Sequence, residues 1–170
     1  MVASSSWIMQ KLLKSYCANT DSATITIFEH ELSRIDTNMI INQALLDKLT
    51  EEAKASPRLR MNYDLRNSEA DQSQRMLNAL EPGTPMPIHR HQKTSETVVC
   101  LRGSLVWEFY DELERRCTEA VELSPNGPVV ALNVPAGQWH SIRVLESGTV
   151  ILECKDGAYE PISDVDILQM

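Results

Sequence analysis

The sequence predicts a mainly β protein, an antiparallel sandwich or barrel with a helical N-terminal appendage. From residue 58 onward, short runs rich in Val, Ile, Leu and Trp alternate with turn signals built from Pro, Gly, Asn and Asp. Only one stretch ahead of these runs has clear helical periodicity. The chain of 170 residues is long enough for one domain with its own core and a short appendage.

The expected strands lie between the turn signals. They cover residues 74–80, 86–91, 95–101, 104–110, 117–123, 129–134, 140–145 and 149–154. Many short strands at this spacing are typical of an antiparallel sandwich or barrel. One further strand is expected at 22–29, where apolar and polar residues alternate.

The expected helix runs from Gln43 to Ala55. Its apolar positions recur at helical spacing and are Leu45, Leu46, Leu49 and Ala53. Asn42 suits the N-cap, and Ser56-Pro57 ends the helix because a residue before proline avoids the helical region. We therefore divide the chain into an N-terminal appendage, 1–57, and a β-domain, 58–170.

Composition excludes several partners and settings. Sixteen basic and twenty-four acidic residues give a net charge of −8, which disfavours nucleic acid as a partner. No apolar stretch is long enough to span a membrane, and the N-terminus lacks the pattern of a signal peptide. The four cysteines form no CxxC pair, which favours a reducing compartment. We expect a cytoplasmic protein.

Three of the four histidines lie beside turns in two short segments. His89 and His91 alternate on one expected strand, so both side chains project from the same face and can converge on one ion. Glu96 follows a polar turn that can bring its carboxylate back to the same point. His140 lies 49 residues after His91, so only the tertiary fold can add it.

Each of these features also has a structural explanation. A His-x-His pair on a strand is often solvent-facing, a Pro-x-Gly is often only a turn, and a single His is often a hydrogen-bonded core residue. The coincidence of three histidines with two turns favours a metal site. The fourth, His30, lies in a poorly patterned segment and receives no ligand role.

Both segments resemble the two cupin motifs. Gly83, His89, His91, Glu96 and Gly103 match the first motif at every spacing, and Pro135-Ala-Gly-Gln-Trp-His140 matches the core of the second. The resemblance implies a cupin-type antiparallel β-barrel (a double-stranded β-helix or jelly roll) with one divalent metal ion held by His89, His91, Glu96 and His140. Two positions depart from the second motif: Val129 replaces its glycine, and Val144 replaces its asparagine.

A narrower resemblance covers residues 40–164. Stretches such as QRMLNALEPGTPMPIHRH and VPAGQWHSIRVLESGTVILECKDGAY are similar to the WbuC family of cupin-fold metalloproteins. Members of that family occur among polysaccharide (O-antigen) biosynthesis genes. The resemblance also implies a homodimer, for which 22–29 could serve as an exchanged or edge strand.

Mixed nitrogen and oxygen ligands do not select one metal, so Fe, Zn, Mn, Ni and Cu are all possible at this site.

Catalytic candidates are Glu96 itself and Tyr63, Arg75 and Arg102. Arg66 and Asn67 are further groups that could direct a substrate, and Trp139 could form a wall of the pocket. Arginines facing the cavity would suit an anionic substrate. Cys100 is in phase with Glu96, although a core cysteine is the favoured interpretation.

Three functions follow as hypotheses. The first is a metalloenzyme that isomerises or epimerises a small polar, sugar-derived substrate. The second is an iron-dependent dioxygenase, which needs a redox-active metal with open positions. The third is a non-catalytic protein that binds a metal ion or small molecule. An open metal site favours an enzyme, because structural zinc sites are closed and rich in cysteine.

Overall fold

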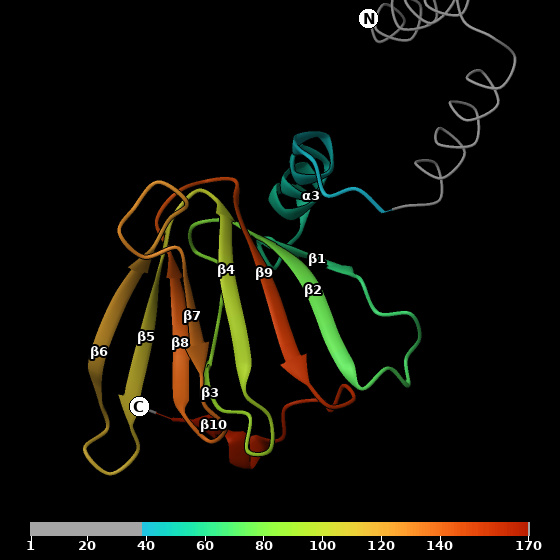
Figure 1. Cartoon of the computed structure of the whole chain (residues 1–170). Helices are drawn as coiled ribbons and strands as arrows, with labels where there is room; N and C mark the ends of the chain where they lie inside the picture. The colour runs from blue at the N-terminus through green and yellow to red at the C-terminus, as the bar shows by residue number, and fades with distance from the viewer. Residues whose placement is uncertain (1–38, 170) are drawn as a thin grey trace, which may run out of the picture. The chain divides into compact units, whose positions relative to one another are not determined.

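A computed structural model describes residues 39–169 (Figure 1). The elements in chain order are α3 (Gln43–Ala55), β1 (Arg60–Asp64), β2 (Ser73–Leu80), β3 (Ile88–His89), β4 (Glu96–Arg102), β5 (Leu105–Asp111), β6 (Arg116–Leu123), β7 (Ala131–Val134), β8 (Trp139–Val144), β9 (Thr149–Asp156), the 3₁₀ turn η1 (Asp164–Asp166) and β10 (Ile167–Leu168). The predicted helix and the eight predicted strands between 74 and 154 are confirmed, although β3 is much shorter than expected. The sequence did not predict β1, η1 or β10, and the expected strand 22–29 lies outside the described residues.

The strands form two antiparallel sheets with jelly-roll pairing. One sheet has the order β1-β2-β9-β4-β7 and the other β10-β3-β8-β5-β6. Strands from the first half of the domain pair with strands from the second half in nested fashion: β2 with β9, β3 with β8, β4 with β7, and β5 with β6. This is the double-sheet pattern of jelly rolls, which includes the cupins.

The expectation of a closed barrel is wrong. Within residues 39–169 no ladder joins the edge strands β1 and β7 of one sheet to the edge strands β10 and β6 of the other. Buried side chains between the sheets hold the two layers together instead. They come from seven strands and are Leu80, Val98, Cys100, Leu105, Trp107, Leu123, Val134, Val144 and Ile151.

Helix α3 packs on the outer face of the first sheet. Leu46, Leu49 and Ala53 contact alternate residues of β2 and β9, namely Leu77, Ala79 and Val150. The Asn42 side chain accepts a hydrogen bond of 3.0 Å from the Leu45 N–H, so the predicted N-cap is confirmed. The predicted boundary between residues 57 and 58 stays a prediction. No helix within the described part of the chain has the length and apolar character to cross a membrane.

The last glycine of the first cupin motif has a packing role. Gly103 has φ +76°, and a Cβ placed there would clash with both the side chain and the backbone of Thr149. Gly137, in the second motif, also has a positive φ of +82°, but no atom lies within 4 Å of its Cβ position. Gly103 therefore combines two requirements that only glycine meets, whereas Gly137 has one.

We expect Gly103→Ala to lower the free energy of unfolding by roughly 2–4 kcal/mol, because it adds left-handed backbone strain to a buried clash. Gly137→Ala is the matched control and should cost only about 1 kcal/mol, from backbone strain alone. Urea unfolding monitored by tryptophan fluorescence measures both values. Equal losses in the two variants would contradict the packing role of Gly103.

Candidate metal centre

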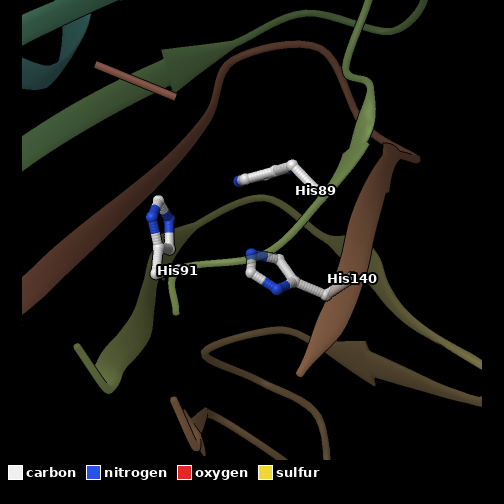
Figure 2. Close-up of side chains that lie close together, drawn as sticks. All are labelled: His89, His91 and His140. Atoms are coloured by element: carbon white, nitrogen blue, oxygen red, sulfur yellow. The ribbon is translucent and has the colours of Figure 1, made fainter. Parts of the chain in front are cut away.

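Two strands of the second sheet bring distant histidines together. His89 on β3 and His140 on β8 are direct cross-strand partners, and their ring centroids lie 4.4 Å apart. His91 follows β3, and its ring centroid lies 5.2 Å from that of His89 and 5.8 Å from that of His140. One nitrogen from each ring lies within 4.8 Å of the others. Figure 2 shows the three rings gathered around a common space, as a shared ion requires.

Backbone carbonyls fix the protonation of two of the rings. His89 Nδ1 lies 3.0 Å from the Pro87 carbonyl oxygen, and His140 Nδ1 lies 2.9 Å from that of Gln138. A carbonyl only accepts hydrogen bonds, so each Nδ1 carries a proton. Nε2 of each neutral ring is then left with a lone pair, as a metal ligand needs.

Glu96 completes the group from the first sheet. Its side chain is 2% exposed, and its carboxylate oxygens lie 2.8 Å from His140 Nε2 and 3.6 Å from His91 Nε2. With His140 neutral, a lone pair on Nε2 faces a carboxylate lone pair, and Glu96 Oε1 is buried without a hydrogen-bond donor. A cation shared by the two groups removes this repulsion, as does a second proton on His140.

The donor atoms lie near the spacing that a divalent metal ion requires, although the histidine nitrogens, within 4.8 Å of one another, must move closer to share one ion. Bonds of about 2.1 Å at angles near 90–110° place neighbouring ligand atoms about 3.0–3.4 Å apart. The contacts of Glu96 at 2.8 and 3.6 Å bracket that range. The described residues therefore supply a site for a divalent ion, and the nitrogen and oxygen donors do not select one metal. The assignment of His89, His91, Glu96 and His140 as its four ligands stays a prediction.

The surroundings keep the donor groups in the form that binds cations. Burial lowers the pKa of His89 to about 4, helped by the neighbouring His140. Burial and the charge of Lys155 lower the pKa of His91 to about 4. Burial acts to raise the pKa of Glu96, but a hydrogen bond from His140, when its Nε2 carries a proton, and the charge of Lys155 outweigh it and lower the pKa to about 2. Both histidines are thus neutral and Glu96 ionised at neutral pH.

β9 carries a charged pair, Glu153 and Lys155, that was not predicted from the sequence. Lys155 Nζ lies 3.0 Å from His91 Nε2, 3.3 Å from Glu96 Oε2 and 2.6 Å from Glu153 Oε1. Burial disfavours the Lys155 ammonium, but the charges of Glu153 and Glu96 outweigh it and raise the Lys155 pKa. A signal was available, because Glu153 and Lys155 alternate in phase with the buried Ile151.

The histidines and Glu96 line a cavity of ≈ 570 Å³. The aromatic wall is Trp107, whose ring stacks on His140 at a centroid distance of 5.3 Å and an interplanar angle of 20°. Trp139, expected as a wall, does not line this cavity. Its indole donates to Glu112 and lies under the Arg90 guanidinium, because residues 139 and 140 point to opposite faces of β8.

Strand alternation also places two catalytic candidates on the outer face. Tyr63 packs against the α3 cluster, next to Leu77 across the β1–β2 pair. Arg75 shares the phase of Leu77 and pairs with Asp71 at 2.8 Å. Neither lines the cavity. Of the other groups considered, Arg66 does line it, and Asn67 donates to Asp71.

A β-bulge redirects Arg102. The register between β4 and β9 shifts after Cys100, so Arg102 pairs with the outward-facing Val150 rather than continuing the inward phase of Glu96. Its guanidinium donates to Asp47 at 2.6 Å and to the Leu46 carbonyl at 2.9 Å. Arg102 therefore ties α3 to the sheet and lies outside the cavity. Cys100 is 2% exposed in the core between the sheets, as expected.

The chain is similar in part to one family model and to several solved structures. A domain of unknown function (DUF6016) matches residues 41–123. TT1209 from Thermus thermophilus is 23% identical with a TM-score of 0.50, over 70% of this chain and 98% of that one. KdgF from a Halomonas species is 14% identical (TM-score 0.48; 61% of this chain, 84% of that one).

Oxalate decarboxylase from Bacillus subtilis is 21% identical with a TM-score of 0.46 over 65% of this chain, and the chain spans only 28% of the decarboxylase. No curated protein sequence matches the chain. The strand order gives a jelly-roll β-sandwich, TT1209 is similar to this chain in fold alone, and the three histidines offer a site for a divalent metal ion.

The metal-free protein is expected to lose stability as the pH falls from about 6.5 to about 4. The unfolded chain protonates its histidines near the ordinary pKa of 6.5, whereas folded His89 and His91 stay neutral until about pH 4. The unfolded state therefore binds more protons in this interval, and each of these histidines lowers the free energy of unfolding by roughly 1–3 kcal/mol. Urea unfolding with a chelator present, over this pH range, measures the loss. The slope should be shallower in His91→Gln, and an equal slope would contradict the explanation.

Removal of the Lys155 charge is expected to strengthen metal binding. The ammonium contacts both His91 and Glu96 and repels a divalent ion at the same place. Lys155→Met should therefore raise the affinity for Zn²⁺ by about tenfold or more, measured by competition with a chromophoric chelator. Lys93→Met is the control, because Lys93 pairs with Glu160 at the surface. Weaker binding in Lys155→Met would show that Lys155 supports the site rather than competing for it.

Proposed function

We propose that the protein binds one divalent metal ion through His89, His91, Glu96 and His140 and acts as a metal-dependent enzyme on a small polar molecule. One observation carries the proposal: three imidazoles and a buried carboxylate from two sheets converge on one wall of a cavity that a small molecule can enter. Structural zinc sites are typically closed and rich in cysteine. Here the site is lined by histidines, and Cys100 is a core residue.

A bound divalent ion would act as a Lewis acid or lower the pKa of a bound water molecule. The chain's own residues prepare the site for it. The Pro87 and Gln138 carbonyls orient the His89 and His140 rings, and Trp107 covers the face of His140. Lys155 and Glu153 place a buried charge pair beside the centre, where it can hold or exclude polar groups of a substrate.

For the reaction we propose isomerisation, epimerisation or a related proton transfer on a sugar-derived substrate. The resemblance to the WbuC family supports a role in polysaccharide (O-antigen) biosynthesis. Polar groups on the inner faces of β1 and β2 support a hydroxyl-rich ligand: Asn62 donates to Asn78 at 2.8 Å, and Asn78 donates to Glu153 at 3.1 Å. The homodimer and the cytoplasmic location stay predictions.

Metal analysis of protein purified without chelator tests the proposal. We expect about one metal ion per chain, and loss of the metal in His91→Ala. His30→Ala is the matched control, because the sequence gives His30 no ligand role. Addition of the metal should raise the midpoint of thermal unfolding of the native protein and not that of His91→Ala.

The identity of the metal then separates the reactions. Iron would favour dioxygenase chemistry, whereas zinc, manganese or nickel would favour isomerisation or hydrolysis. If neither the native protein nor His91→Ala takes up metal after reloading, the metalloenzyme proposal fails. The remaining hypothesis is then a non-catalytic protein that binds a small molecule.

A further inference from the structure

Almost all cationic side chains of the described chain have an acidic partner. Ten of the thirteen Lys and Arg residues between 39 and 169 lie within 4.0 Å of a carboxylate oxygen. The exceptions are Arg58, Arg60 and Arg115. With a net charge of −8, the chain has enough acidic residues to pair with each of these arginines. Two unpaired arginines side by side therefore need an explanation.

Arg58 and Arg60 both line the cavity of the metal centre. Arg60 is the first residue of β1 and lies opposite Leu80, which faces the core. Its Nη1 donates to the Pro85 carbonyl at 2.8 Å, so one corner of the guanidinium is anchored to the protein. Burial, and after it the like charge of Arg58, lower the pKa of Arg60. A half-buried cation beside a second cation is costly unless an anion compensates it.

The residue between the two arginines has a strained backbone. Leu59 adopts φ +53°, a conformation that costs a bulky side chain roughly 1–2 kcal/mol. Two hydrogen bonds of 2.9 Å hold it there: the Leu59 N–H donates to the Ser56 carbonyl, and the Glu81 N–H donates to the Leu59 carbonyl. The turn at Leu59 thus fixes the chain between Arg58 and Arg60. Strain of this kind is frequent at ligand sites.

The other cations of the cavity are already neutralised. Arg66 binds Asp64 through both carboxylate oxygens, and Lys155 lies between Glu153 and Glu96. The cavity therefore carries four cationic side chains against two carboxylates, Glu96 and Glu153, before any metal ion is added. The uncompensated charge lies at Arg58 and Arg60.

We propose that Arg58 and Arg60 form an anion subsite that holds a carboxylate or phosphate group of the substrate while the rest of the molecule extends toward the metal centre. Guanidinium groups suit both anions, because their N–H groups match two oxygens at once. That the bound anion belongs to a substrate rests on the proposed function. The subsite itself consists of residues separate from the four proposed metal ligands.

The test uses the full-length, metal-loaded protein with inorganic phosphate and malonate as probes, and sodium chloride at equal ionic strength as the reference. Isothermal titration and the midpoint of thermal unfolding both report binding. We expect binding of at least one probe to weaken by about tenfold or more in Arg60→Gln and in Arg58→Gln, through the loss of a charge-assisted hydrogen bond. The probe that binds more tightly identifies the anionic group. Arg115→Gln is the matched control, because Arg115 is also unpaired but lines neither this cavity nor its neighbour.

Metal content is measured on the same variants, so that the two proposals can fail separately. Native metal content with weakened anion binding in both arginine variants supports the subsite. Unchanged binding of both probes in Arg58→Gln and Arg60→Gln overturns it, and so does a loss of the same size in Arg115→Gln. Should Arg60→Gln fail to fold, Arg58→Gln, at an exposed position, still decides the matter. Loss of metal in His91→Ala with phosphate binding retained would separate the subsite from the metal centre.

Discussion

The candidate site depends on the short pair of strands β3 and β8, which places His89 directly opposite His140. β3 has only two residues, so its position depends on the strands that flank it. β8 pairs on its other side with β5 over six residues, and β10 pairs with β3. Asp166 adds to this from the C-terminal segment, where its carbonyl accepts from the Arg90 N–H and its carboxylate accepts from Gln92. A two-residue strand can therefore hold a histidine in place.

The second constraint is the burial of charge between the sheets. Glu96 and Lys155 are cross-strand partners on β4 and β9, and both are mostly buried. A buried carboxylate is tolerated only when cations or donors surround it. In this structure Lys155 fills that role for Glu96 Oε2, and a divalent ion would also compensate Oε1, which has no donor. The same arrangement lowers the pKa of His91 and Glu96, so stabilising the buried charge and preparing the ligands have one physical cause.

The two faces of the first sheet contact different parts of the molecule. Odd-numbered residues of β2, such as Leu77 and Ala79, pack under α3, whereas even-numbered residues such as Asn78 face the cavity. Arg102 belongs to the outer face and joins α3 to β4 and to the loop before β9. Arg60 belongs to the inner face. An arginine of this sheet thus contributes to stability or to the cavity according to its phase on the strand.

Much of this could be read from the sequence. Its hydrophobic alternation and turn residues determined the helix and eight strands, because these patterns depend on local geometry. The spacing of His89, His91, Glu96 and His140 indicated one shared site, and the structure brings these four side chains together. The tertiary structure decided what local patterns do not contain. Within residues 39–169 no ladder joins the edges of the two sheets, so they stay open there, and the bulge after Cys100 turns Arg102 outward. Lys155 reaches His91, and Arg58 and Arg60 reach the cavity, only through contacts between segments far apart in the chain.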